Sequence, residues 1–345
     1  MTKRVGVTIG KFMPLHLGHE LLIKMGSDLT DEFHVIVSGK ETDKIPLSIR
    51  AGWVLDFCVK EKLINITVHK HTDKSPTPIN IDEKGTVLDV DFQLYWANEF
   101  SKLVPDATHI VSSDMYGKVL ADRMSLEWLP VDPDREAVPI SGTEIRADIT
   151  KNFKYVSSVA RNHYIKKVAI IGAESTGKST LTKYMAKVTN SAYAPEYGRT
   201  LSVNKDNVLT EDDFYDIIDG QSVLIDHAAA TTQSPFVFTD SEAYTTFLYH
   251  TEFLGKVHPS MDLYGMHQDF DLYVLLLPDV KWVDDGTRTM ADQQKREKFT
   301  SDLKDFLDTY KKPYIVIGGS DFADRRAKAK SEILDFLSNV VDTNG

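Results

Sequence analysis

Nine residues near the middle of the chain have the types and spacing of a phosphate-binding loop. Residues 171–179 read I-G-A-E-S-T-G-K-S and contain the pattern G-x-x-x-x-G-K-S. In such a loop, backbone N–H groups point at phosphate oxygens, the lysine adds a mobile positive charge, and the serine hydroxyl reaches Mg²⁺. The apolar segment 167–171 predicts a buried strand before the loop, and segment 181–187 predicts a helix after it. We therefore expect nucleotide phosphates to bind at Gly172, Glu174, Ser175, Thr176, Gly177, Lys178, Ser179 and Thr180.

Two histidines near the N-terminus, His16 and His19, lie at the predicted start of another helix, just after a predicted strand over residues 4–9. Side chains three residues apart share one helix face, and open α/β sheets bind ligands at the carboxyl ends of their strands. Beside a helix N-terminus, the pair is expected to form a cationic, donor-rich phosphate pocket. A metal pair is a second interpretation, although no third protein ligand follows nearby, and two loop histidines without function are a third.

A short segment ahead of the middle of the chain predicts a second phosphate-binding helix start. Residues 140–146 read I-S-G-T-E-I-R, in which Ser141 can cap a helix and Glu144 completes a capping box. The capped helix offers backbone N–H groups, and Arg146 offers a guanidinium fork for phosphate oxygens.

The remaining pattern predicts two α/β domains with mainly parallel sheets. Strands and helices alternate from residue 4 to residue 131 and again from residue 167 to residue 337, as βαβ units require. The pattern weakens between them, so we expect a first domain over residues 1–150, a linker over 151–165 and a second domain over 166–345. The polar segment 72–89 is expected to be a surface loop, with a mobile lid as the alternative.

Further polar residues lie where the predicted strands end. In the first half, Arg50 and Trp53 could hold a phosphate and stack on a ring, although Trp53 also suits a core. Ser113 and Asp114 follow a strand, where Asp114 could bind a ribose or an adenine amino group or simply cap the next helix. In the second half, the candidates are Glu196, Tyr197 and Arg199, the acidic strand end Asp240, and Arg288 ahead of a basic helix.

The totals exclude several classes of protein. The formal net charge of −11 argues against broad nucleic-acid or anionic-membrane binding. The single cysteine, Cys58, leaves no disulfide framework and is expected in a core. The basic N-terminus has too short an apolar run for a signal peptide, so we expect a soluble cytoplasmic protein.

Together, these motifs resemble the bifunctional nicotinamide-nucleotide adenylyltransferase / ribosylnicotinamide kinase family. The pattern G-x-F-x-P-x-H-x-G-H at residues 10–19 and S-x-T-x-x-R at 141–146 is similar to the nucleotidyltransferase superfamily, and the segments E-Y-x-R, D-x-E and W-V-D-D-G-x-R match the kinase half. V-D-P-D-R at 131–135 also matches. The resemblance implies a Rossmann-like nucleotidyltransferase domain followed by a P-loop kinase domain.

The resemblance also implies the roles of the candidates. In the first domain, His16, His19 and Arg146 would stabilise the ATP phosphates, and the wider ATP site would be Gly10, Lys11, Phe12, Gly18, Ser113, Asp114, Ser141 and Thr143. Arg50 and Trp53 would bind nicotinamide mononucleotide (NMN). In the second domain, Glu196, Tyr197, Arg199 and Asp240 would bind nicotinamide riboside, Ser179 and Asp240 would hold Mg²⁺, and Arg288 would close over the transferred phosphate. The base remains open between Asp240 and Glu196.

Two alternatives remain open. One is a pantetheine-phosphate adenylyltransferase joined to a dephospho-coenzyme A kinase, and the other is a nucleotide-binding sensor without turnover. Some family members carry an N-terminal helix-turn-helix domain and repress transcription; this sequence begins at the first strand, so that role is not expected. Whether the chain forms a homo-oligomer is not indicated by its sequence.

Overall fold

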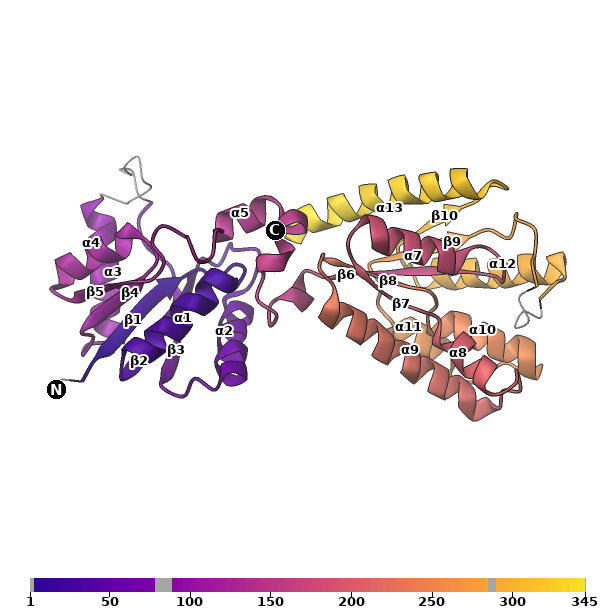
Figure 1. Ribbon diagram of the computed structural model, residues 1–345, viewed down its shortest axis with the longest axis horizontal. Coiled ribbons are helices and arrows are strands. Elements are labelled where there is room, and N and C mark those ends of the chain that lie inside the picture. The colour runs from indigo at the N-terminus through magenta and orange to yellow at the C-terminus, as the bar shows by residue number, and fades with distance from the viewer. Residues whose placement is uncertain (1–2, 78–88, 285–289, 345) are drawn as a thin grey trace. The chain divides into compact units, whose positions relative to one another are not determined.

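The computed structural model describes residues 3–77, 89–284 and 290–344 and divides the chain into two compact units. One unit comprises residues 1–161 and the other residues 162–343. Each unit is built around its own sheet (Figure 1). The boundary at Arg161 falls within residues 151–165, the segment that we predicted as a linker. Three short helices lie in or overlap this segment: α6 (Ile149–Asn152), η1 (Phe153–Tyr155) and η2 (Arg161–His163).

The sheet of the first unit has five parallel strands in the order β3-β2-β1-β4-β5. The order reverses between β1 and β4, so loops at the carboxyl end of β1 diverge from those of its neighbour and leave room for a ligand. Its strands are β1 (Val5–Gly10), β2 (Glu32–Gly39), β3 (Ile66–Thr72), β4 (His109–Ser112) and β5 (Glu127–Pro130). Its helices are α1 (Leu17–Leu29), α2 (Leu47–Glu61), α3 (Val90–Leu103), α4 (Met115–Met124) and α5 (Gly142–Ala147), besides those named above.

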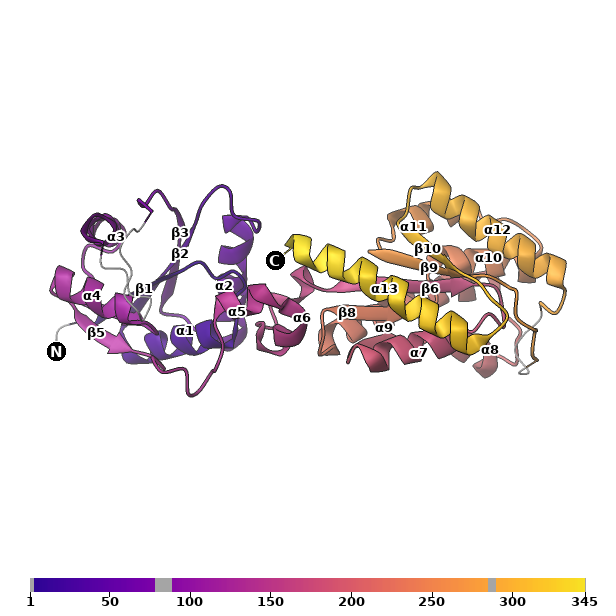
Figure 2. The same cartoon turned by 90° about the horizontal axis from the view of Figure 1, so that it is seen from above.

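Helices cover both faces of this sheet (Figure 2). Alternate residues of β1 face opposite ways, so Val5 and Val7 pack with Trp96 and Phe100 of α3. On the opposite face, a Cβ atom added to Gly26 of α1 would meet the Phe33 ring at 2.2 Å, which shows how closely α1 lies on β2.

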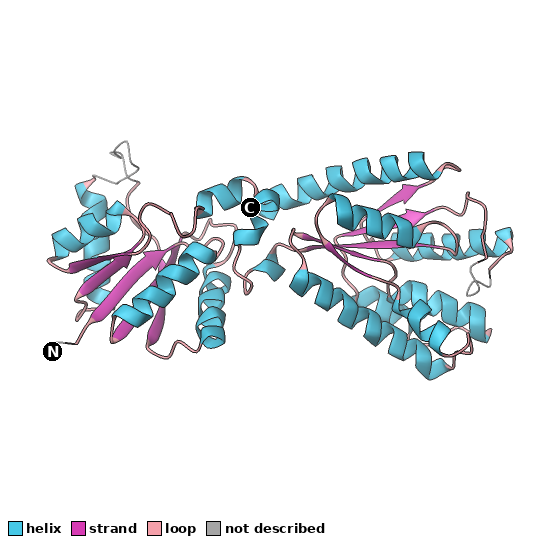
Figure 3. Cartoon of the chain, in the orientation of Figure 1, coloured by secondary structure: helices cyan, strands magenta, loops and turns pink. Residues whose placement is uncertain are grey.

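The second unit repeats this architecture with the order β10-β9-β6-β8-β7, again all parallel (Figure 3). Its strands are β6 (Lys166–Gly172), β7 (Ala192–Ala194), β8 (Phe236–Thr239), β9 (Leu272–Leu276) and β10 (Tyr314–Ile317). Its helices are α7 (Lys178–Val188), α8 (Tyr197–Asn204), α9 (Glu211–Thr231), α10 (Ala243–Leu254), α11 (Met261–His267), α12 (Gln293–Thr309) and α13 (Phe322–Asn344). The central strand β6 runs directly into the phosphate-binding loop.

Two cores lie on the two faces of the second sheet. One joins β6 and β9 to α9, α10 and α12 through residues such as Ile171, Phe247 and Leu303. The other joins the sheet to α7 and α13 through Ile170, Met185 and Ile333. Helices thus pack on both sides of a buried parallel sheet, which explains the continuous apolar strands in the sequence.

The predicted fold class is confirmed, since both units are α/β with parallel sheets. The structure adds three helices that the sequence analysis did not assign, α8, α10 and α11. Residues 78–88 of the predicted 72–89 loop lie outside the described residues. Among the described residues, none of the helices has the length and apolar character needed to cross a membrane.

Candidate functional site

The first candidate site lies where β1 passes into α1. His16 is the N-cap residue of α1, and its Nδ1 atom accepts a hydrogen bond from the Gly18 N–H (3.1 Å). His19 stacks on it, with ring centroids 3.7 Å apart, and the buried Phe12 ring lies 4.6 Å from His19 on the other side. Phe12 has a left-handed backbone (φ 50°), and a Cβ atom on Gly10 would meet its ring at 3.1 Å. The loop therefore holds the two imidazoles in fixed, mutually packed positions.

The protonation of the histidines differs from our expectation. Burial lowers the pKa of His16 to about 4, with Arg135 and Arg146 adding to the shift. Burial also holds the pKa of His19 well below its ordinary value. The prediction of a cationic histidine pair was therefore wrong for the free chain, because both rings are too buried to carry charge at neutral pH. Since Nδ1 of His16 accepts a hydrogen bond, its Nε2 atom carries the proton and can donate to a phosphate.

The 140–146 segment comes to the same place. Ser141 caps α5 and Glu144 completes the capping box, which confirms that prediction. Arg146 donates from Nη1 to the Met13 carbonyl (2.6 Å) and from Nη2 to the Thr143 hydroxyl (3.1 Å). A Cβ atom on Gly142 would lie 3.7 Å from His16 Nε2 and 3.3 Å from Arg146 Nη1. The two sequence motifs of the first unit thus meet in one cluster.

Residues just after η1 contact this histidine loop. Val156 forms an antiparallel bridge with His16, and the Ser157 N–H donates to the Leu15 carbonyl (3.0 Å). Val156 is fully buried. We had expected these residues in a linker, because they have no periodic pattern, and only the tertiary structure shows that they hold the histidine loop.

Arg50 and Trp53 do not present free polar groups in this unit. The Arg50 guanidinium is fully buried and donates to the carbonyls of Lys11 (2.7 Å), Ser38 (2.9 Å) and Ile45 (2.9 Å). It also pairs with Asp43 at 3.0 Å. Trp53 is buried in the core. As placed, Arg50 holds the backbone of the loop after β1, and its predicted role in binding NMN stays a prediction.

The other first-unit candidates lie at the same sheet edge. Lys11 has an exposed side chain, and Gly18 packs beneath the His16 ring. Ser113 is half-buried at the end of β4, and Asp114 caps α4 by accepting from the Gly117 N–H (3.0 Å). The capping role, one of the two roles expected for Asp114, is therefore the one that the structure displays.

The second candidate site is the loop between β6 and α7. Gly172 needs its positive φ (146°), and a Cβ atom there would lie 2.7 Å from the Leu276 carbonyl oxygen. Gly177 caps α7 with φ 92°. Lys178 is buried, and its Nζ atom donates to the carbonyls of Gly172 (3.0 Å) and Ala173 (3.1 Å). This geometry is that of a nucleotide-phosphate cradle whose lysine rests on the loop itself.

A cavity opens directly from this loop, with an empty volume of about 920 Å³ that includes the space open to solvent. Loop residues form one end of it. Glu196 and Arg199, whose side chains lie 3.5 Å apart, contribute charge, and apolar side chains from α9 and α10 also line the cavity. Those apolar residues are Phe214, Ile217, Tyr249 and Phe253. Their helical spacing, three or four residues apart, was the one signal that could have found them in the sequence.

Asp240 is the most perturbed carboxylate of this site. Burial, and the neighbouring negative charge of Glu196, raise the pKa of Asp240 to about 7, while Lys178 and the Ser179 hydroxyl act in the opposite direction. Its Oδ1 atom is buried without a hydrogen-bond partner among the described residues. A buried carboxyl oxygen beside a serine hydroxyl matches the hard oxygen donors that Mg²⁺ prefers, so Ser179 and Asp240 fit the predicted ion.

Two predicted residues of the second unit have other positions. The Tyr197 ring packs against α9, where a Cβ atom on Gly220 would meet it at 2.4 Å, and Tyr197 is not among the residues that line the cavity. Its predicted stacking on a riboside ring is not what this structure displays. Glu242, next to Asp240 in sequence, is fully engaged in capping α10. Arg288 lies outside the described residues.

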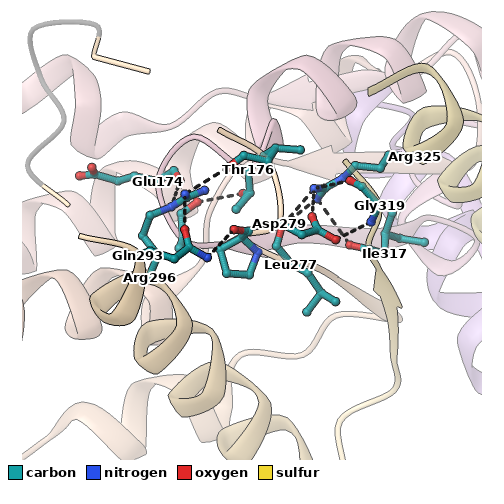
Figure 4. Close-up of polar contacts among 12 residues, drawn as sticks. Glu174, Thr176, Leu277, Asp279, Gln293, Arg296, Ile317, Gly319 and Arg325 are labelled. Atoms are coloured by element: carbon teal, nitrogen blue, oxygen red, sulfur yellow. Dashed lines mark hydrogen bonds and ion pairs between the residues drawn. The ribbon is translucent and has the colours of Figure 1, made fainter. Parts of the chain in front are cut away.

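A second cavity shares part of the phosphate-binding loop. Thr176, Gly177 and Thr180 line both cavities. The rest of the second cavity is formed by Leu181, Leu276, Ile317, Phe322, Arg325 and Arg326. Arg325 is buried and donates to the carbonyls of Leu277 (3.1 Å) and Gly319 (3.3 Å), so it fixes the loops that follow β9 and β10 (Figure 4). The two cavities therefore meet at the phosphate-binding loop.

The chain thus combines two α/β units. The first carries two packed histidines, and the second carries a phosphate-binding loop. The family model described as an AAA domain matches residues 167–325. The trifunctional NAD biosynthesis/regulator protein NadR of Escherichia coli (strain K12) is 27% identical over 94% of this chain and 81% of its own length. The NadR protein of Salmonella typhimurium gives the same values.

Solved structures share the fold of this chain along most of its length. A NadR protein in complex with NAD and AMP-PNP matches with a TM-score of 0.67 and 21% identity, covering 97% of each chain. A NadR protein in complex with NR matches with a TM-score of 0.66 and 22% identity, over 97% of this chain and 96% of the other. The chain is thus similar to the NadR proteins along most of its length, which confirms the resemblance that the sequence motifs predicted.

Proposed function

We propose that the chain is a bifunctional enzyme of NAD biosynthesis: its second unit phosphorylates nicotinamide riboside with ATP, and its first unit adenylylates the resulting NMN with ATP. The support comes from the two phosphate sites and from homology to NadR proteins, one of which was solved with NAD and AMP-PNP and another with NR. Both reactions use ATP, a polyanion that a chain with net charge −11 must bind through local cationic sites.

In the kinase reaction, the 5′-hydroxyl oxygen of the riboside attacks the γ-phosphorus of ATP, and the bond to the ADP oxygen breaks. Lys178 and the loop N–H groups stabilise the charge on the phosphoryl oxygens. Asp240 receives the hydroxyl proton, and Glu196 and Arg199 hold the ribose. Mg²⁺ on Ser179 and Asp240 would neutralise phosphate charge. Phe214, Tyr249 and Phe253 supply apolar surface for the pyridine ring, and the second cavity takes the nucleobase of ATP.

In the adenylyl transfer, a phosphate oxygen of NMN attacks the α-phosphorus of ATP, and pyrophosphate leaves. The nucleophile is already an anion, so no strong base is needed, and positioning and charge stabilisation carry the rate. The Nε2–H of His16 and the guanidinium of Arg146 both lie within 4 Å of a Cβ atom built on Gly142, where they can donate to the triphosphate. No covalent enzyme intermediate is expected.

The observation that carries the proposal is the first cavity, because its lining combines a nucleotide-phosphate loop with aromatic side chains of α9 and α10. The lining also includes the Glu196–Arg199 ion pair, suited to a ribose, and Ser241, whose chain neighbour Asp240 has a carboxylate with a raised pKa. These groups suit a small hydroxylated substrate with a flat ring. A nucleotide sensor without turnover would not need a base beside the γ-phosphate position.

The test uses two variants of the full chain. His19→Ala is expected to stop NAD formation from NMN and ATP while riboside phosphorylation continues, and Lys178→Ala is expected to do the reverse. Loss of both reactions in either folded variant would contradict the assignment of one reaction to each unit. Absence of both wild-type reactions, with turnover of phosphopantetheine or dephospho-coenzyme A instead, would replace the proposed substrates. ATP or NAD binding with no pyrophosphate or ADP released would indicate a sensor.

A further inference from the structure

Glu174, the third residue of the phosphate-binding loop, is attached to the chain that follows β9 at several points. Its carboxylate Oε2 accepts hydrogen bonds from the Met290 N–H (2.8 Å) and from the Trp282 Nε1–H (3.4 Å). Its backbone carbonyl accepts from Nε of Arg296 (3.1 Å), in the first turn of α12. A single loop residue thus receives donors from both sides of the 285–289 segment and from the helix beyond it.

The next loop residue repeats the attachment. The Ser175 hydroxyl donates to the Val283 carbonyl and accepts from the Val283 N–H, both at 3.1 Å. Ser175 has a left-handed backbone (φ 62°), which a residue with a Cβ atom adopts only where other contacts hold it. The reciprocal pair with Val283 is such a contact.

Arg296 connects this loop to the carboxyl end of β9. It is 1% exposed, and its Nη1 atom donates to the Val280 carbonyl (3.2 Å) and to Gln293 Oε1 (3.0 Å). Gln293 in turn donates to the Pro278 carbonyl (3.0 Å). Figure 4 shows Arg296 and Gln293 bound on one side of the segment after β9 and Arg325 on the other. The first turn of α12 is therefore fixed to the sheet and to the phosphate loop together.

These contacts determine the direction of the Ser175 N–H group. A trans peptide unit is planar, with its N–H directed opposite to its C=O. Because Arg296 holds the Glu174 carbonyl toward α12, the Ser175 N–H of the same peptide unit is directed to the other side. Glu174 and Ser175 both line the cavity at the loop, so a change in this peptide plane would move a phosphate donor.

We propose that Glu174, Ser175 and Arg296 are positioning residues of the kinase: the chain after β9 holds the phosphate loop through them in the geometry that receives the triphosphate. The inference rests on the proposed phosphoryl transfer but concerns residues that do not touch the reacting hydroxyl. Misplacement of a donor by a fraction of an ångström lowers the rate of transfer while leaving the separate riboside wall of the cavity unchanged.

The experiment compares Glu174→Ala with Glu174→Gln in the full chain. Glutamine retains an acceptor oxygen for the Met290 N–H, and alanine does not. We expect kcat for riboside phosphorylation to fall about ten- to a hundredfold in Glu174→Ala with the riboside KM nearly unchanged. Glu174→Gln should restore most of the rate. Lys298→Ala, an exposed position on the same helix, is the matched control and should behave as wild type.

Amide hydrogen exchange at Met290 separates this proposal from the proposed function, because it needs no riboside. Exchange at that amide should accelerate in Glu174→Ala and stay protected in Glu174→Gln, whether or not wild type phosphorylates the riboside. A wild-type kcat in Glu174→Ala would overturn the proposal. So would a Glu174→Gln variant that is as slow as alanine with Met290 still protected, since the charge itself would then act on the phosphates.

Ser175→Ala keeps the test decisive if Glu174→Ala does not fold. This variant loses the two bonds to Val283 without leaving a buried charge, so it should melt near the wild-type temperature. Its kcat should fall several-fold with the riboside KM again unchanged, and an unchanged kcat would overturn the proposal.

Discussion

The Nε2 atom of His16 lies 3.7 Å from the position that a methyl group on Gly142 would occupy, although the two residues belong to opposite ends of the first unit. The same methyl group would lie 3.3 Å from Arg146 Nη1. Gly142 therefore keeps open the space between two of the groups that we propose for the ATP phosphates. The absence of a side chain at this position is itself part of the site.

Gly142→Ala should weaken ATP binding by the first unit without unfolding it. The added methyl group fills the space that phosphate oxygens would use, and at a helix start alanine costs little stability. We expect the ATP KM for NAD formation to rise about tenfold or more, with riboside phosphorylation unchanged. Gly52→Ala is the matched control, because a Cβ atom there meets nothing within 4 Å. Equal kinetics in the two variants would show that phosphates do not occupy this space.

ATP binding to the first unit should take up protons. Both histidines are neutral at pH 7 in the free chain, since the pKa of His16 is about 4 and that of His19 is also lowered. A polyanion beside the rings favours the imidazolium form and raises both pKa values, so affinity should increase as pH falls from 7.5 to 6. Calorimetry with Lys178→Ala, in two buffers of different ionisation enthalpy, measures the uptake. An identical heat in both buffers would mean that the rings stay neutral in the complex.

The rate of riboside phosphorylation should depend on the ionisation of Asp240. In the free chain its pKa is raised to about 7 by burial and by Glu196, and only the ionised form binds Mg²⁺ or accepts a proton, so kcat/KM for MgATP should rise with pH through about 7 and then level. Glu196→Gln removes the neighbouring charge and should move this rise to lower pH. If the pH dependence of kcat/KM were the same in Glu196→Gln as in wild type, the titrating group would not be Asp240.

The raised pKa of Asp240 also predicts a stability effect. The folded-state pKa lies above the unfolded value of 3.8, so the native state binds this proton more tightly, and the associated stability is lost as pH rises through about 7. Asp240→Asn should therefore stabilise the free chain at pH 8 by about 1–3 kcal/mol while abolishing phosphorylation. The gain should shrink at pH 5, where Asp240 is already protonated. Equal melting temperatures for both proteins at pH 8 would contradict the buried, ionised carboxylate.

Local patterns in the sequence predicted most of the strands and the backbone geometry of the two candidate phosphate sites, because each depends on residues close together in the chain. The loop at 172–179 and the capping box at Ser141 are formed by consecutive residues and follow from their order alone. Properties that depend on tertiary contacts were not predicted. The neutral state of His16 depends on burial, the bound state of Arg50 on carbonyls from three segments, and the role of Arg296 on a loop far away in sequence.

The aromatic residues that line the first cavity were not predicted either, because only the tertiary structure brings them to the phosphate loop. Phe253 of α10 lines the same cavity as the phosphate loop. Phe253→Ala removes ring surface from the wall that we propose for the pyridine ring, so the riboside KM should rise about tenfold while the ATP KM changes little. Phe322→Ala, which changes the second cavity, should show the opposite pattern if that cavity takes the nucleobase. Both KM values are measured in one kinase assay. A rise in the ATP KM alone for Phe253→Ala would mean that the nucleobase binds in the first cavity and the riboside in the second.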